Sequence, residues 1–387
     1  SAIRLFMAPK TGIVMAMTEL VATNPWGTCA LALALRFFLP GLAWGWAFRM
    51  EADGGGPWPA RIRSGALALF IGLLFALGSS AALAEFGRFT PAAEWAALLL
   101  FSGAGLIAGF VKNRAGLLLF SRRAAPAASL FLAGAAVIML LPRQGEWVAG
   151  GWDPGVYLNQ GAWVSHTGSF RPAPDPVFSR FTSRELAALT RNVENFTEGH
   201  PVFPLNTETR AFDLFFFRLT PTLIAVMHRC GGLRAAARVN LFAGLIVALL
   251  FPALLLALGR TGGQVFWPTL FLMAQPLWLY HLHIPTSEML QLALLCGSAM
   301  ALPLRADSGA GRWLLPAGLL AMMINRFSFL PFGTLFVLMI SVLDFSRAGR
   351  AQISRERLFQ FIALAAGAAY DYATTPVTIE RLAFIVP

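Results

Sequence analysis

The sequence GWDPGVYLNQGAWVSHTGSF occupies residues 151–170 and opens the only long polar interval of the chain, roughly residues 143–210. Asp153 is followed directly by Pro154, an order typical of a helix with an acidic N-cap and proline at its first position. We therefore expect a short amphipathic helix that ends near Ser165. We interpret Asp153 as a carboxylate just outside a membrane, and the rest of the chain as the scaffold that holds it.

The composition predicts an integral membrane protein. Hydrophobic residues make up 57% of the 387 residues and charged residues only 13%, whereas a soluble domain carries about 25% charged residues. Several apolar runs of about 18 residues or more fit helices that cross about 30 Å of hydrocarbon. The expected fold class is all-α, a polytopic transmembrane bundle with about 9–11 spans.

Charge and cysteine content narrow the class of function. The net charge of +11 comes almost entirely from arginine, spread over many short loops. Such an excess is typical of cytoplasmic loops and contacts with lipid phosphates, and it argues against nucleic-acid binding. Cys29, Cys230 and Cys296 lie in or next to apolar segments without metal-ligand spacing. They predict neither a disulfide framework nor a zinc site.

The apolar runs give the predicted order of spans. Spans are expected at about 28–48, 64–85, 91–111, 124–142, 239–259, 265–280, 289–304 and 327–343, with a last helix from about 358. Residues 313–324 are apolar but short for a span. Residues 211–228 are apolar but interrupted by charges and a proline. An amphipathic helix at the interface is the preferred interpretation there, and a further span is the alternative. Arg36 lies inside the first span and should face protein or water.

The positive-inside rule sets the predicted orientation. The basic loops 49–63 and 112–123 belong in the cytoplasm, which puts the interval after residue 141 outside. Every basic cluster beyond this long loop then lies inside, and Arg326 is the clear exception. Thr182 and Glu185 form a capping box for a second short helix in the loop, ending near Val193.

We expect two regions: additional N-terminal transmembrane helices over residues 1–123, and a membrane module over 124–387 whose long outer loop, residues 143–236, carries short interfacial helices. A signal peptide is not expected, because Glu19 interrupts residues 11–23 and no cleavage site stands out. The chain stops at Pro387 soon after an apolar segment, so a missing C-terminal part is left open.

Three ionisable residues are expected to converge on the outer face: Asp153, Glu288 and Arg326. Charges near a bilayer cost several kcal/mol unless they are paired or hydrated, which makes them functional candidates. Each has a structural alternative. Asp153 could act only as a cap, Glu288 could only favour the start of its helix, and Arg326 could extend to lipid headgroups.

Two histidines expected near the outer side of the membrane do not indicate a metal site. His281 and His283 are two residues apart, so they do not share one face of a helix, and no metal-ligand partners are evident. We expect interfacial packing or substrate contact for them.

Several stretches resemble the GT-C glycosyltransferases, polytopic enzymes that use polyprenyl-phosphate-linked sugars. The similarity is greatest to bacterial members related to protein O-mannosyltransferases and aminoarabinose transferases. It covers roughly residues 125–345 and is carried by residues 152–169, DPVFSRFTSRELAAL (175–189), GGLRAAARVNLFAGL (231–245), QPLWLYHLHIPTSEML (275–290) and GLLAMMINRFSFLPF (318–332).

The resemblance implies a role for individual residues. Asp153 matches the catalytic acidic position of the first outer loop, Glu288 the second acidic position, and Arg326 a basic position near the donor phosphate. We expect Tyr157, His283 and Asn325 to contact substrate with Arg326. Pro154 replaces a common second acidic residue, and His283 replaces a common arginine. The first three spans have no counterpart in the minimal fold.

The implied function is an inverting transfer of a sugar from a polyprenyl-phosphate donor to an acceptor hydroxyl. Asp153 is the expected base, and neither a cofactor nor a divalent metal is expected. The implied partners are the bilayer, the lipid-linked donor and a glycan, lipid or protein acceptor. The implied location is a bacterial inner or plasma membrane with the site facing the periplasm or exterior. The alternatives are a transporter or flippase of lipid-linked sugars and an inactive scaffold of envelope assembly.

Overall fold

The computed structural model of the chain describes residues 25–47, 57–112, 153–171, 174, 178–186, 188, 205–206, 210–212, 217–260, 263–304, 309–326, 329–345 and 350–374. These residues are helical apart from loops and two short strands. Strand β1 (Leu205–Asn206) pairs antiparallel with β2 (Ala211–Phe212). The all-α class is thus confirmed for this part of the chain. The predicted span at 124–142 lies outside the described residues.

The helices follow the chain order of the predicted spans. They are α2 (Pro25–Ala47), α3 (Pro57–Glu85), α4 (Pro91–Lys112), α6 (Asp153–Thr167), the short 3₁₀ turn η2 (Phe178–Arg180), α8 (Leu219–Ala236), α9 (Val239–Ala257), α10 (Gly263–Ala274), α11 (Pro276–Leu282), α12 (Glu288–Leu304), α13 (Gly309–Asn325), α14 (Leu330–Phe345) and α15 (Arg350–Thr374).

Three helical segments in the described ranges are long and apolar enough to cross a membrane: Arg63–Glu85, Pro91–Val111 and Val239–Ala257. Shorter apolar stretches occur in α2, α12, α13, α14 and α15. The outward surface of α4 is apolar, with Leu100 75% and Phe110 69% exposed. Contiguous apolar surface of this kind needs lipid or a partner to cover it. The coarse prediction of a membrane protein is therefore supported.

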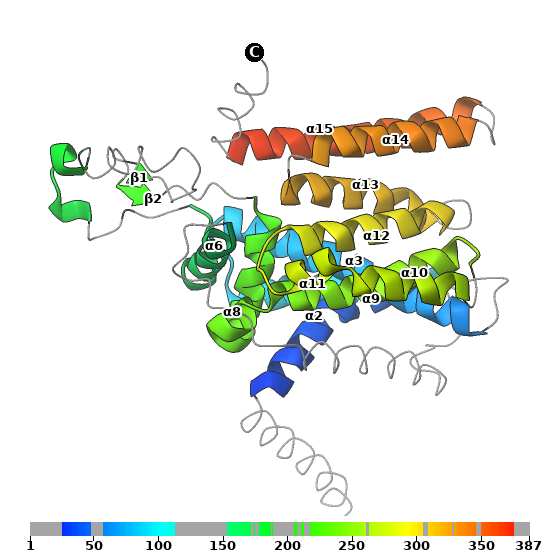
Figure 1. Cartoon of the computed structure of the whole chain (residues 1–387), viewed down its shortest axis with the longest axis horizontal. Helices are drawn as coiled ribbons and strands as arrows, with labels where there is room; N and C mark the ends of the chain where they lie inside the picture. Colours follow the sequence, from blue (N-terminus) through cyan, green and yellow to red (C-terminus); the bar gives the residue numbers. More distant parts are fainter. Residues whose placement is uncertain are drawn as a thin grey trace, which may run out of the picture.

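The long helices form one layered bundle. α2 packs on α3 and α4, and α3 also contacts α8, α9, α12 and α13. α15 covers α13 and α14, so these C-terminal helices form the outer layer in Figure 1. The short helix α6 packs on α8 at one end of the bundle, and the two strands extend beyond that end. The N-terminal helices thus pack directly on the helices that follow the long loop.

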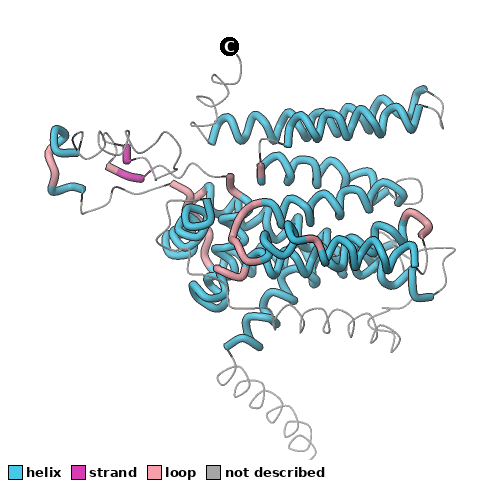
Figure 2. The backbone as a smooth tube through the Cα atoms, in the orientation of Figure 1, coloured by secondary structure: helices cyan, strands magenta, loops and turns pink. Residues whose placement is uncertain are grey.

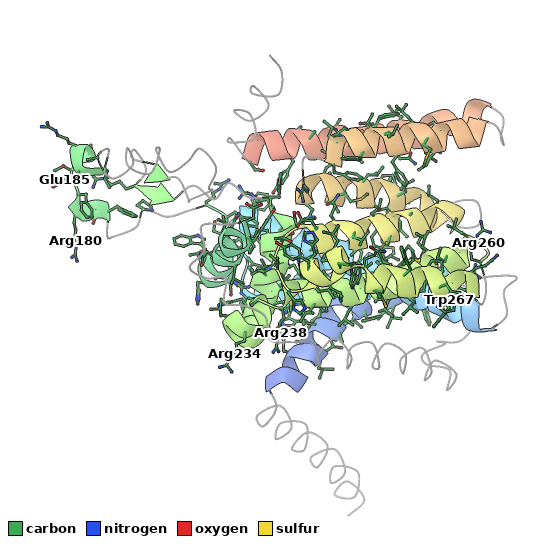
Figure 3. The ribbon with its side chains drawn as sticks, in the orientation of Figure 1. Arg180, Glu185, Arg234, Arg238, Arg260 and Trp267 are labelled. Atoms are coloured by element: carbon green, nitrogen blue, oxygen red, sulfur yellow. The ribbon has the colours of Figure 1, made fainter. Side chains whose placement is uncertain are left out.

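Polar contacts tie several helix ends together at the end of the bundle that carries α6. Glu85, the last residue of α3, accepts a hydrogen bond from the Tyr370 hydroxyl (2.7 Å) and pairs with Arg218 Nε (3.0 Å). Arg218 also donates to the Thr374 carbonyl (2.8 Å) and lies over the Phe170 ring. Because helix ends far apart in sequence meet here, this end is a defined polar face; Arg260 marks the opposite end in Figure 3.

Two predicted boundaries were wrong, and proline explains both. Residues 211–228 do not form one interfacial helix. Residues 211–212 are a strand, and α8 begins at Leu219 and continues to Ala236 with residues 219–227 buried in the protein. Pro221 is tolerated in a first turn, where its missing N–H has no partner to lose. The predicted span 265–280 is divided into α10 and α11 at Gln275. The backbone of Gln275 is extended because a residue before proline disfavours the helical conformation.

Candidate active site

Helix α6 starts at Asp153, as predicted, and presents Asp153 and Tyr157 one turn apart. Asp153 is exposed, whereas Tyr157 is buried, at 3% exposed. The Tyr157 phenol hydrogen-bonds with Ser287, which directly precedes Glu288. Burial raises the pKa of Tyr157, and the charges of Glu288 and Asp153 add to the increase. The phenol therefore stays protonated and can donate a hydrogen bond.

Glu288 and Arg326 form an ion pair across the α12 and α13 ends. Arg326 Nη1 donates to Glu288 Oε1. The Arg326 side chain is 38% exposed and the Glu288 side chain 35% exposed. Burial acts to raise the pKa of Glu288, but hydrogen bonds from Thr286 and Arg326 outweigh burial and lower this pKa. Glu288 is therefore ionised at neutral pH. The pair combines a fixed geometry with access from solvent.

The four predicted residues of this group thus come together. The charges of Glu288, Arg326 and Asp153 all act on the pKa of Tyr157, so the three side chains lie within electrostatic range of its hydroxyl. They arise from α6, α12 and the end of α13. Figure 2 shows the loop that joins α11 to α12 running along the end of the bundle at which α6 lies. The arrangement offers partly exposed carboxylates and a guanidinium, with the buried Tyr157 hydroxyl beneath the surface.

Asn325 lies behind the ion pair rather than in it. Its side chain is fully buried, donating to the Ser287 carbonyl (3.2 Å) and to Gln291 Oε1 (2.9 Å). Its oxygen accepts a hydrogen bond from the buried Thr220 hydroxyl (2.8 Å). The predicted substrate contact does not fit this burial. Asn325 instead joins α13 to α12, and so fixes Arg326 relative to Glu288.

His283 is half-buried and occupies the turn that ends α11, where its N–H donates to the Tyr280 carbonyl (3.1 Å). It lies in the same loop as Ser287 but no contact with the ion pair defines a role for it. In the described ranges, no three His, Cys, Asp or Glu side chains are grouped so that they could hold a metal ion.

Asn240, on the second position of α9, is a positioning residue that sequence reasoning missed. Its buried amide donates to the carbonyls of His281 (3.0 Å) and Ile284 and to Thr286 Oγ1 (3.3 Å). The amide thus fixes the turn before Glu288 and the hydroxyl that hydrogen-bonds to the Glu288 carboxylate. A polar residue at the start of the apolar run LFAGLIVALL could have indicated a positioning role. Its hydrogen-bond partners, however, lie 41 to 46 residues later in the sequence.

A second polar cluster, near the C-terminal end of α6, is deeply buried. Glu94 on α4 is 1% exposed and pairs with Arg36 on α2, whose Nε and Nη2 lie 2.8 Å from its oxygens. Arg229 Nη1 lies 3.9 Å from the same carboxylate. The Ser80 hydroxyl also donates to Glu94 (3.4 Å). Arg36 therefore faces protein, as expected for a charge inside an apolar helix.

This second cluster also positions α6. Arg229 donates to the Ser165 carbonyl from Nε (3.2 Å) and Nη2 (3.1 Å), and it also contacts the Phe89 carbonyl. His228 Nδ1 lies 3.0 Å from Ser165 Oγ. A cation at the last turn of a helix satisfies carbonyls that have no intrahelical partner. The C-terminal end of α6 is thus attached to α8.

Comparisons with protein-family models, with curated proteins and with solved structures return no match to this chain.

Proposed function

We propose that this chain is a membrane glycosyltransferase of GT-C type that moves a sugar from a polyprenyl-phosphate donor to an acceptor hydroxyl. The observation that carries the proposal is the half-exposed Glu288–Arg326 pair, set beside Tyr157 and Asp153 at one end of an apolar bundle. A guanidinium and a carboxylate at the end of apolar helices suit a substrate with an anionic headgroup and a hydrocarbon tail.

The proposed reaction proceeds with inversion at the anomeric carbon. The acceptor oxygen attacks that carbon while its proton passes to the Asp153 carboxylate, and the bond from carbon to the phosphate oxygen breaks. General-base help of this kind contributes about 10²–10⁴ in rate. The leaving group is a lipid phosphate, which needs a cation rather than a proton, and Arg326 can donate hydrogen bonds to its oxygens.

The remaining residues have supporting roles in this proposal. Glu288 holds the guanidinium of Arg326 in place and can accept hydrogen bonds from sugar hydroxyls. The protonated Tyr157 phenol positions Ser287 and the start of α12. The location that fits this chemistry is a bacterial inner or plasma membrane with the polar face directed to the periplasm or exterior.

The direct test is transfer from labelled polyprenyl-phosphate sugars in membranes that contain the full chain. Asp153→Asn should abolish transfer and leave the unfolding transition unchanged, because the side chain is exposed. Glu185→Gln, the same carboxyl-to-amide change at an exposed capping residue, should retain transfer. Normal turnover in Asp153→Asn would remove Asp153 from the mechanism.

The same experiment separates the alternative functions. A transporter or flippase would move labelled lipid to the other leaflet of sealed vesicles without breaking the bond between sugar and phosphate. A scaffold would do neither.

A further inference from the structure

Cys29 and Cys230 come into contact although 200 residues separate them in sequence. Cys29 lies in the first turns of α2, and Cys230 lies in α8. Cys29 Sγ lies beside Gly231, the residue after Cys230, at 3.6 Å from the position that a Cβ of residue 231 would take. The two thiols interact, and both cysteines are free. Two interacting thiols are close to the arrangement that thiol–disulfide exchange requires.

The surroundings distinguish the two thiols. Arg36 Nη1 donates a hydrogen bond to Cys230 Sγ (3.2 Å), and Cys230 is partly exposed. The hydrogen bond from Cys29 and the charge of Arg36 lower the pKa of Cys230. Cys29 is buried, at 4% exposed. A partly exposed thiolate stabilised by a cation is the nucleophile, and a buried neighbouring thiol is suited to react second.

The break in α8 makes this contact possible. Gly231 and Gly232 have non-helical backbone angles directly after Cys230, and Gly232 has a φ of 66°. A Cβ at Gly231 would lie 2.8 Å from the Ala235 Cβ and 3.6 Å from Cys29 Sγ. Glycine therefore permits the turn and keeps the space beside the two sulfurs open.

We propose that Cys230 and Cys29 are a reactive dithiol site that exchanges with small disulfides and closes to a disulfide between α2 and α8. The Cys230 thiolate attacks one sulfur of the small disulfide, whose S–S bond breaks to release one thiolate. Cys29 then loses its proton to solvent and attacks Cys230 Sγ, which releases the second thiolate. Two protein sulfurs are oxidised, and the small disulfide is reduced to two thiols.

The site also has a place in the fold. Arg229, next to Cys230, holds the end of α6, so the covalent link would form beside the residue that positions the helix carrying Asp153. The proposal does not depend on sugar transfer, and its test does not measure it.

The test treats the full chain, folded in detergent or nanodiscs, with 4,4′-dithiodipyridine and follows the release of thiopyridone. Peptide mass spectrometry without reduction then identifies the products. We expect two thiopyridones for each reagent consumed and a linked Cys29–Cys230 peptide. Cys296, equally buried at 4% exposed, is the matched internal control and should stay unmodified until SDS is added.

Single variants separate the two roles. Cys29→Ser should stop the reaction at a mixed disulfide on Cys230, with one thiopyridone released. Cys230→Ser should leave Cys29 as slow to react as Cys296, and Cys296→Ser should behave as the unaltered protein. The proposal is overturned if the unaltered protein keeps a stable mixed disulfide on Cys230, if Cys230 fails to react, or if Cys29 reacts equally fast without Cys230.

Discussion

The buried cluster at Glu94 allows a quantitative prediction that requires no knowledge of the substrate. Glu94→Gln keeps the shape of the side chain but removes the charge that faces Arg36 and Arg229. Removing one partner of a buried ion pair costs about 3–5 kcal/mol, because the remaining charge stays desolvated. Glutamine retains one acceptor oxygen, so we expect the lower end, about 3 kcal/mol, or roughly a hundredfold in the folded-to-unfolded ratio.

A double variant tests the cause of this loss. Arg36→Met removes the stranded cation and fills similar volume, so Arg36→Met/Glu94→Gln should recover to within about 1–2 kcal/mol of the unaltered protein. Arg229 accounts for the residual cost, although it keeps its two carbonyl partners. The assay is SDS-induced unfolding in mixed micelles, followed by tryptophan fluorescence and by helical circular dichroism. A Glu94→Gln loss below about 0.5 kcal/mol, or strict additivity in the double variant, would refute the buried network.

Three further predictions concern the candidate active site. Thr286→Val removes a hydrogen bond to ionised Glu288, so the pKa of Glu288 should rise and, on acidification, the ion pair should be lost at a higher pH. The pH midpoint of carbodiimide labelling of Glu288 should therefore move up, whereas Thr286→Ser should leave it unchanged. Identical pH profiles for the unaltered protein and both variants would contradict the assignment. Asn240→Leu leaves the buried carbonyls of His281 and Ile284 without this donor and should lower the free energy of unfolding by about 2–4 kcal/mol in the same SDS assay. A change below about 0.5 kcal/mol would argue against a positioning role for Asn240. Arg326→Lys should weaken binding of polyprenyl phosphate in nanodiscs roughly 10- to 100-fold, because the planar two-donor geometry is lost, and unchanged binding would exclude Arg326 as the phosphate ligand.

Local sequence signals predicted the local structure well. The acidic residue followed by proline located the start of α6, and the capping box was confirmed, with the Thr182 N–H donating to Glu185 (2.7 Å) and the Glu185 N–H to the Thr182 hydroxyl (3.3 Å). Glu288 and Arg326, each singled out as an ionisable residue on the same predicted face, form an ion pair. These signals work because caps and desolvated charges are governed by the residues themselves and their nearest neighbours.

Contacts between distant segments could not be predicted in the same way. Asn240 is one polar side chain in an apolar run until its partners in the 281–286 turn are known. Asn325 was expected to contact substrate with Arg326, yet the packing of α12 on α13 buries it completely. The contact between Cys29 and Cys230 has no signature at all in their spacing. One sequence contains the apolar pattern of each helix but not the choice of neighbours.

The Glu288–Arg326 pair has a consequence for how tightly an anionic lipid could be held. The guanidinium is already neutralised before a ligand arrives, so an incoming phosphate must share it with a carboxylate that repels it. In the proposed transfer, affinity for the resting donor should therefore be modest. The attraction grows as negative charge accumulates on the departing oxygen, so the pair would stabilise bond cleavage more than it stabilises the bound donor.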